Sequence, residues 1–118
     1  MSHRRLTAIM FSDITGYTAM MQKNVTKGKR VAQIYRKILS ELTSDHEGRI
    51  LQHFGDGGLA IFKSSVEALQ CAREIQESVK TYDIPFRIGI HLWDISIDGN
   101  DVFGDGVNIA SRETSIIL

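Results

Sequence analysis

Two short apolar runs on either side of a glycine-rich tetrapeptide limit most strongly what this chain can fold into. Residues 50–54 and 59–62 flank Gly55, Asp56, Gly57 and Gly58, a pattern typical of two antiparallel strands joined by a tight hairpin. An isolated two-stranded hairpin is marginal in water, so its apolar side chains need further strands or helices to cover them. The sequence therefore predicts a sheet with at least one covered face.

Helical periodicity supplies two candidates for that cover. Between residues 27 and 47, apolar residues recur at spacings of three and four, which places them on one face of a helix. A capping box of Ser64 and Glu67 predicts the start of a second helix. Its expected buried stripe consists of Val66, Leu69, Ile75 and Val79.

Two further apolar runs complete the predicted sheet. Residues 6–11 favour a strand buried on both faces, and residues 86–92 favour a fourth strand. A second hairpin is expected to turn at residues 98–100, and a helix is expected from Val107 onward. The order strand, helix, strand, strand, helix, strand is that of a ferredoxin-like βαββαβ sandwich. This is an α+β fold in which helices pack on an antiparallel sheet.

The composition is that of one ordinary globular domain, expected to span residues 1–118. With 14 basic and 14 acidic residues, it favours neither a nucleic-acid surface nor a polybasic membrane patch. No apolar run approaches the ~20 residues that cross a bilayer. The single cysteine, Cys71, excludes an intramolecular disulfide and is expected to be a small buried residue. We expect a cytoplasmic chain, either by itself or as the cytosolic part of a larger, membrane-attached protein.

Two aspartates stand where predicted strands end. Asp13 follows the first strand, and Asp56 lies at the tip of the hairpin. Because the first and third strands of a ferredoxin-like sheet are neighbours, both carboxylates can converge on one spot. Converging carboxylates repel each other unless a cation lies between them, and Mg²⁺ or Mn²⁺ prefers such oxygen ligands. The alternative is that both are ordinary turn residues, because aspartate is common in glycine turns.

Two other segments could contact an anion. After Asp13, the chain turns at Gly16 into a helical stretch, where the backbone N–H groups of Gly16, Tyr17 and Thr18 could hold phosphate oxygens. Asn108 and Arg112 are four residues apart, so on the expected last helix they would share a face. The alternative for Arg112 is a surface position at a solvated helix end.

Four blocks of the sequence resemble, in order and spacing, the catalytic domain of class III adenylate and guanylate cyclases. The blocks are FSDITGYT at residues 11–18, FGDGGLAIF at 54–62, RIGIH at 87–91 and VFGDGVNIASR at 102–112. The resemblance runs from about residue 6 to residue 112, and family domains continue well beyond this point. It therefore implies a catalytic domain that is incomplete at its C-terminus.

The resemblance implies an adenylate cyclase that converts ATP to 3′,5′-cyclic AMP and pyrophosphate. Asp13 and Asp56 match the two metal-binding aspartates, and the backbone carbonyl of Ile14 matches an additional ligand, for two Mg²⁺ or Mn²⁺ ions per site. Asn108 matches the residue that orients the ribose. Arg112 matches the residue that stabilises negative charge on the α-phosphate.

Base selection in the family depends on two positions, occupied here by Gln52 and Asp101. Asp101 could accept a hydrogen bond from the adenine 6-amino group. Adenylate cyclases usually carry lysine at the position of Gln52, and guanylate cyclases typically carry glutamate there. Because a Gln52 amide N–H can still be donated to adenine N1, the resemblance favours ATP over GTP.

The family builds its active sites between two head-to-tail domains, which implies a homodimer with two shared sites. One subunit would provide the metal ligands, and the other would provide Asn108 and Arg112. Two departures from the family pattern, Gln52 and Trp93, leave open a degenerate, catalytically inactive module for dimerisation or nucleotide binding. A guanylate cyclase acting on GTP is a further alternative. A regulatory domain in a longer parent protein is compatible with all three of these functions.

Overall fold

The computed structural model describes the backbone of residues 2–98 and 107–117 and the side chains of residues 7–92. Within these ranges, no helix is long and apolar enough to cross a membrane. The chain runs through the following elements, in order: β1 (Ser2–Ile14), α1 (Tyr17–Lys23), α2 (Val25–Asp45), β2 (Arg49–His53), β3 (Gly57–Phe62), α3 (Ser65–Thr81), β4 (Phe86–Asp98) and β5 (Val107–Ile117).

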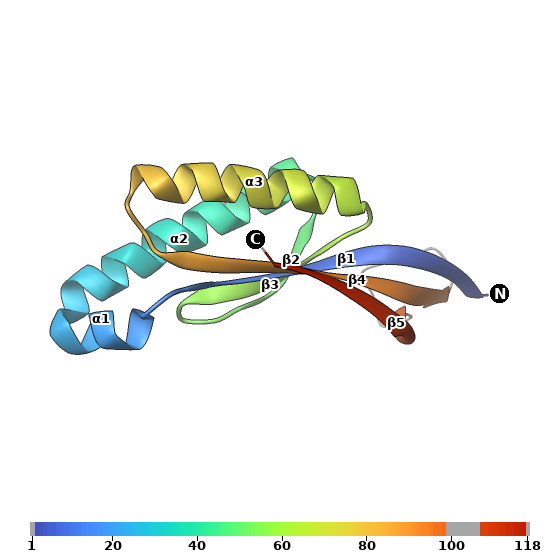
Figure 1. Cartoon of the computed structure of the whole chain (residues 1–118), viewed down its shortest axis with the longest axis horizontal. Helices are drawn as coiled ribbons and strands as arrows, with labels where there is room; N and C mark the ends of the chain where they lie inside the picture. The colour runs from blue at the N-terminus through green and yellow to red at the C-terminus, as the bar shows by residue number, and fades with distance from the viewer. Residues whose placement is uncertain (1, 99–106, 118) are drawn as a thin grey trace.

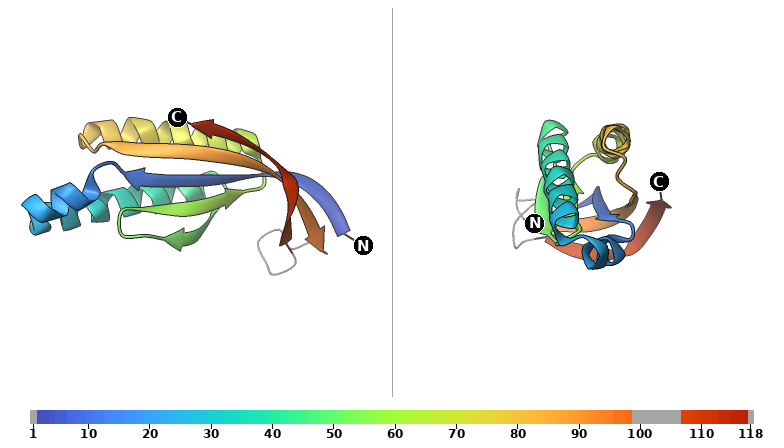
Figure 2. Two further views of the ribbon diagram at one scale, coloured as in Figure 1. Left: turned by 60° about the horizontal axis from the view of Figure 1, so that its bottom comes forward. Right: turned by 90° about the vertical axis from the view of Figure 1, so that its left-hand side faces the viewer.

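The strands form one sheet in the order β2-β3-β1-β4-β5, and every neighbouring pair is antiparallel. Helices α2 and α3 lie side by side on one face of this sheet, whereas α1 extends beyond one end of it (Figures 1 and 2). The first four strands with α2 and α3 form the predicted βαββαβ sandwich. The fold-class prediction is therefore confirmed, and β5 adds a strand at the edge beside β4.

The two central strands are longer than predicted. β1 and β4 pair without interruption from Ser2 opposite Asp98 to Ile14 opposite Phe86. Along β1, Met10 is buried against the helices while its neighbour Phe11 is only partly buried. The prediction of a strand buried on both faces was wrong, because the helices cover only one side of the sheet.

The segment from Val107 onward is a strand, which corrects the predicted helix. β5 pairs with β4 from Val107 opposite Ile97 to Ile117 opposite Gly89, with an irregularity in register between them. Five of its eleven residues are Val, Ile or Thr, whose branched Cβ atoms favour a pleated sheet over a helix. The long edge of β4 provides the partner. Of the predicted turn at 98–100, only Asp98 belongs to the described residues, and it ends β4.

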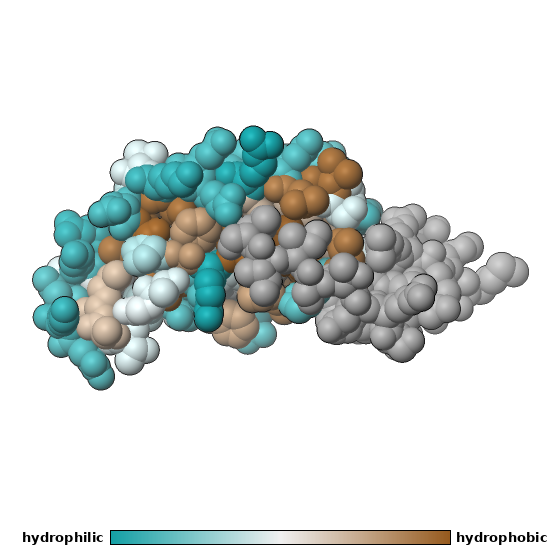
Figure 3. Space-filling model, viewed as in Figure 1, coloured by the Kyte–Doolittle hydropathy of each residue, from teal (hydrophilic) through white to brown (hydrophobic). Residues whose placement is uncertain are grey.

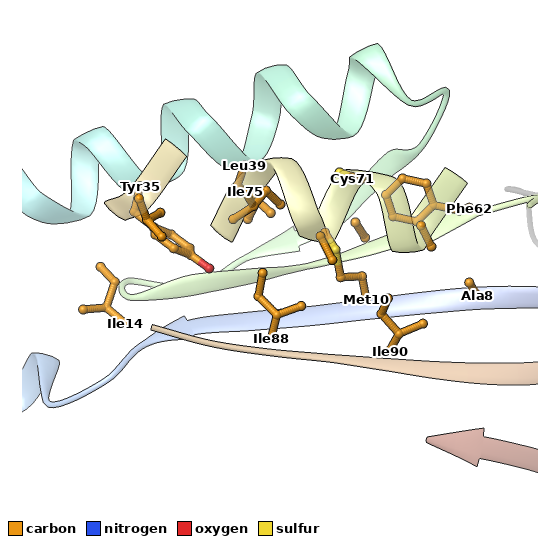
Figure 4. Close-up of a cluster of buried hydrophobic side chains, with 14 of the residues drawn as sticks. Ala8, Met10, Ile14, Tyr35, Leu39, Phe62, Cys71, Ile75, Ile88 and Ile90 are labelled. Atoms are coloured by element: carbon orange, nitrogen blue, oxygen red, sulfur yellow. The ribbon is translucent and has the colours of Figure 1, made fainter. Parts of the chain in front are cut away.

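The core lies between the sheet and the two helices (Figure 4). Helix α3 contributes Ala68, Cys71, Ala72, Ile75 and Val79. The predicted stripe was wrong at Val66 and Leu69, which are 59% and 38% exposed. The buried positions nearest the start of the helix carry small residues instead, and these let α3 approach the sheet closely. Burial raises the pKa of the Cys71 thiol to about 12, so this cysteine is protonated and unreactive, as predicted.

The start of α3 and the end of α2 are joined through His46. The Ser64 hydroxyl accepts a hydrogen bond from the backbone N–H of Glu67, as the capping box predicts. The Glu67 carboxylate contacts His46 Nδ1 at 2.8 Å, and the Glu74 carboxylate contacts His46 Nε2 at 2.6 Å. A neutral imidazole carries only one N–H, so a ring that bonds two carboxylates is doubly protonated. His46 is therefore a cationic link between the two helices.

This link makes the stability of the fold depend on pH. The hydrogen bond with Glu74, helped by the one with Glu67, raises the pKa of His46 above its usual 6.5. A raised folded-state pKa means that the stabilisation is fully present below about pH 6.5 and disappears as the pH rises through the folded-state value. We expect His46→Gln to lower the free energy of unfolding by ~1 kcal/mol at pH 6, because both carboxylates are partly exposed.

The measurement is urea denaturation of both proteins at pH 6.0 and at pH 9.0. The difference in the free energy of unfolding between the parent chain and His46→Gln should be smaller at pH 9.0 than at pH 6.0. Lys37→Gln, which removes an exposed pair with Glu41, serves as the control with little effect at either pH. An equal loss at both pH values would contradict a charged His46.

Candidate active site

The segments that carry Asp13 and Asp56 meet at one end of the sheet. Asp56 belongs to the three-residue connection between β2 and β3, which is closed by a 2.8 Å hydrogen bond from the N–H of Phe54 to the carbonyl of Gly57. The N–H of Ile14 donates to the Asp56 carbonyl at 2.7 Å. The tip of the hairpin is thus fastened to the end of β1, and Asp13, Ile14 and Asp56 lie together.

Gly57 makes this close approach possible. In the ladder it lies opposite Asp13. A Cβ atom at this position would be 1.9 Å from the Ser12 carbonyl oxygen and 2.8 Å from the Asp13 Cα, both of which are backbone atoms of a central strand. Only glycine leaves room for β1 there, so the distance between the two candidate metal ligands depends on it.

Arg87 is a site residue that the sequence analysis did not identify. It lies opposite Asp13 on β4, and its guanidinium donates two hydrogen bonds to the Asp13 carboxylate, Nη2 to Oδ2 at 2.8 Å and Nε to Oδ1 at 3.2 Å. Such a bidentate pair holds the carboxylate in a fixed orientation. The expected adjacency of the first and fourth strands could have indicated that Arg87 lies near Asp13. However, only the register between β1 and β4 places these two residues opposite each other.

A buried phenol lies beneath the site. Tyr35 of α2 is 1% exposed, and in Figure 4 its hydroxyl points away from α2 toward the sheet. Burial raises the pKa of Tyr35 strongly, and the charges of Asp13 and Asp56 raise it further, whereas the nearby Ser12 hydroxyl opposes this. Within the described residues, neither hydroxyl has a partner in hydrogen-bonding geometry. Tyr35 lies on the apolar face predicted for residues 27–47, and helical periodicity does not indicate that the aspartates are near it.

The donor atoms at this end of the sheet suit a hard divalent cation. Two carboxylates and the Ile14 carbonyl are oxygen ligands of the kind that Mg²⁺ and Mn²⁺ prefer. Among the residues with described side chains, no group of three or more His, Cys, Asp or Glu side chains gathers as a metal site. A cation here would complete its coordination with water and phosphate oxygens, as Mg²⁺ commonly does. It would also take the place of the Arg87 guanidinium at Asp13.

The predicted substrate-binding residues differ in where the structure places them. Gly16, at φ 72° and ψ 22°, is the left-handed residue before α1, so Tyr17 and Thr18 form its first turn directly beyond Ile14. Gln52 lies on β2 with an exposed side chain. Asp101 lies outside the described residues.

Asn108 and Arg112 lie on β5, far from Asp13 of the same chain. Asn108 is opposite Ser96 on β4, whereas Asp13 is opposite Arg87, nine residues away along the same strand. At roughly 3.3 Å per residue, this separation is about 30 Å. The prediction that Asn108 and Arg112 share a helix face was wrong, because this segment is a strand with an irregular register between Ile109 and Glu113. One chain therefore does not bring its own Asn108 to its own Asp13.

Comparison with known proteins identifies the family. No family model matches the sequence. The solved structure of an adenylate/guanylate cyclase/hydrolase from Silicibacter pomeroyi is 34% identical to this chain and superposes on it with a TM-score of 0.68. The match spans 90% of this chain and 67% of the Silicibacter pomeroyi chain. The chain belongs to the class III adenylate and guanylate cyclase family.

Two further similarities define what this class III cyclase domain shares with its relatives. The putative adenylate cyclase 3 of Rhizobium meliloti is 35% identical over 92% of the domain, which spans only 20% of that protein. The guanylyl cyclase Cya2 shares the fold at 21% identity, with a TM-score of 0.63 over 93% of this chain and 66% of its own. Proteins described as adenylate and guanylyl cyclases thus share this architecture.

Proposed function

We propose that this domain is the catalytic domain of an adenylate cyclase that converts ATP to 3′,5′-cyclic AMP and pyrophosphate with two Mg²⁺ or Mn²⁺ ions. The observation that carries this proposal is the fastening of the hairpin tip to the end of β1, which brings Asp13, Ile14 and Asp56 together. The turn at Gly16 adjoins this group directly, as a site for a triphosphate beside a metal requires.

The proposed reaction is an in-line attack of the ribose 3′-oxygen on the α-phosphorus, with pyrophosphate as the leaving group. When bound, the metal ions would lower the pKa of the 3′-hydroxyl and neutralise phosphate charge. Asp13 and Asp56 would hold the ions, and the backbone N–H groups near Gly16 would bind phosphate oxygens. Arg87, once released from Asp13, would be free to bind phosphate oxygens in the same bidentate manner.

A head-to-tail homodimer would complete the site. Because Asn108 and Asp13 of one chain are about 30 Å apart along the sheet, Asn108 and Arg112 would reach the nucleotide from a second copy. There Asn108 would orient the ribose, and the Arg112 guanidinium would stabilise the charge that develops on the α-phosphate. Each dimer would then hold two equivalent sites.

We propose ATP as the substrate because of two side chains. A Gln52 amide N–H would be donated to adenine N1, and the Asp101 carboxylate would accept from the 6-amino group. GTP presents the opposite donor and acceptor at these two base positions. Since the domain spans a fifth of the Rhizobium meliloti protein, we also propose a longer, cytosolic parent that carries a regulatory domain.

The test is incubation of the purified chain, and of a chain extended to full family length, with Mn²⁺ and either ATP or GTP. Cyclic AMP and pyrophosphate from ATP alone would support the proposal, whereas cyclic GMP would reassign the substrate. The absence of product from both proteins, together with retained nucleotide binding, would favour a catalytically inactive module. Gln52 and the engagement of Asp13 by Arg87 are the features that favour this second candidate.

The Asp13–Arg87 pair predicts competition between Arg87 and a metal. Replacing Arg87 by glutamine removes a cation that occupies the same carboxylate, so we expect the affinity for Mn²⁺ to rise several-fold in the absence of nucleotide. The measurement is titration of free Mn²⁺ by electron paramagnetic resonance. Arg73→Gln, an exposed position on α3, is the matched control. Unchanged or weaker Mn²⁺ binding in Arg87→Gln would show that the guanidinium does not compete.

A further inference from the structure

A pocket adjoins the candidate active site, between α1, the start of α2 and the residue that precedes β4. Its volume is about 450 Å³, and its polar lining comes from Thr15, Lys23, Asn24 and Lys27. None of Asp13, Asp56 and Arg87 lines it, so it is distinct from the group of residues assigned to the metals. The pocket shares Gly16 with the turn proposed to bind the triphosphate, but the side chains of Lys23, Asn24 and Lys27 have no role in the proposed reaction.

All the charge in this lining has one sign. Lys23 and Lys27 are the only charged residues that line the pocket, both are exposed, and within the described residues no ion pair is recorded for either of them. The surrounding sequence strengthens the effect, because no acidic residue occurs between Asp13 and Glu41. The same span carries six basic residues: Lys23, Lys27, Lys29, Arg30, Arg36 and Lys37.

This segregation makes the segment formed by α1 and the first half of α2 positive, whereas Asp13 and Asp56 supply negative charge at the neighbouring end of the sheet. The end formed by α1 and the start of α2 shows mostly hydrophilic residues in Figure 3, on the left in that view. A concave site lined by one sign of charge concentrates counter-ions of the opposite sign. The expected ligand is therefore an anion.

Two neutral polar side chains in the pocket, beside the apolar Ala19, Met20 and Pro85, are hydrogen-bond donors as well. The Asn24 side-chain oxygen already accepts from the backbone N–H of Lys27 at 3.1 Å, which leaves the Asn24 amide NH₂ to donate. The Thr15 hydroxyl is a further donor. Two ammonium groups, an amide and a hydroxyl suit a ligand with several acceptor oxygens, such as a phosphate group.

We propose that this pocket binds a small phosphate-bearing anion, separately from the metal site, and that its occupancy influences that site. The floor of the pocket includes Thr15 and Gly16, which follow Ile14 directly. The N–H of Thr15 donates to the carbonyl of Pro85 at 2.9 Å, and Pro85 also lines the pocket. A bound anion would hold the turn after β1 against the start of β4, two residues beyond the Asp13–Arg87 pair on each strand.

The test is a titration of the ¹⁵N-labelled chain with phosphate and, separately, with pyrophosphate. Binding is monitored by the amide chemical shifts, at constant ionic strength and without metal. We expect saturable shifts at Thr15, Gly16, Lys23 and Lys27, and further shifts at Asp13 and Arg87. The double substitution Lys23→Gln/Lys27→Gln should weaken binding at least about tenfold, since both ammonium contacts are lost. Lys29→Gln/Lys37→Gln removes the same charge outside the pocket and should weaken binding less than about twofold.

Three outcomes would overturn the proposal. These are equal weakening by the two double variants, the same shifts with sodium chloride alone, and the absence of saturable shifts. Metal-free ATP that competes for the same amides would identify the phosphates of a nucleotide as one source of the ligand, whereas no competition would point to a free phosphate or pyrophosphate. Asp13→Ala should retain phosphate binding, so failure of the proposed cyclase function and failure of this pocket can be distinguished.

Discussion

Replacing Asp13 by alanine should reduce metal-dependent cyclic AMP formation by at least about a thousandfold, and Asp56→Ala should do the same. Each substitution removes one of only two carboxylates at the end of β1 and the tip of the hairpin. Without both, no cation can be held where the 3′-hydroxyl and the triphosphate are expected to meet.

Two measurements check this result. Cyclic AMP formation with Mn²⁺ and ATP reports the loss of turnover, and Mn²⁺ binding by electron paramagnetic resonance reports the loss of the ligand independently of turnover. Glu77→Ala, an exposed carboxylate on α3, is the matched control for the change of charge and should behave as the parent chain does. Unchanged turnover in either aspartate variant would remove the two-metal assignment.

The same variants test whether the sites are shared between subunits. Asp13→Ala and Asn108→Ala should each be inactive alone. In a random equal mixture, half of the dimers contain one subunit of each kind, and each of these has one intact site. About a quarter of the parent activity should therefore return. A mixture as inactive as its components would contradict the head-to-tail arrangement.

The second large effect concerns the fold. Gly57→Ala should lower the free energy of unfolding by at least ~3 kcal/mol or prevent folding, because the added Cβ would lie 1.9 Å from the Ser12 carbonyl oxygen. Relief would require β1, paired on both sides, to separate from β3. Urea denaturation followed by circular dichroism measures the loss.

Gly55→Ala provides the control within the same hairpin. A Cβ atom at Gly55 would meet nothing within 4 Å, so we expect a loss below about 1 kcal/mol. If Gly57→Ala were as stable as Gly55→Ala, the tight packing of the hairpin on β1 would be incorrect. The pair of variants therefore separates close backbone approach from a general effect of losing a glycine.

Much of the fold could be predicted from local pattern. The hairpin at Gly55–Gly58, the amphipathic α2 and the cap at Ser64 each leave a signal within a few residues. The last segment could not be assigned this way, because its spacing of Asn108 and Arg112 fits a helix while its β-branched residues fit a strand. Pairing with β4, which lies earlier in the chain, decides between them.

The candidate site shows the same division. The proximity of Asp13 and Asp56 could be predicted because strand order alone makes the first and third strands neighbours. Arg87 and Tyr35 could not, because their place beside the aspartates depends on cross-strand register and on how far α2 extends over the sheet. Neither the register between strands nor the position of α2 over the sheet leaves a periodic pattern in a single sequence.

The uninterrupted pairing of β1 with β4 has a mechanical consequence. Asp13 stands at the far end of a strand that is hydrogen-bonded to β4 from Ser2 onward and to β3 from Ala8 onward. Such a strand is stiff along its axis, since it can neither shorten nor slide past β3 and β4 without breaking the hydrogen bonds that pair it with them. A displacement applied near Ser2 would therefore move β1 together with the strands paired to it, and Asp13 would keep its position relative to Asp56. In this architecture, the spacing of Asp13 and Asp56 is set by the paired strands as a unit rather than by β1 alone.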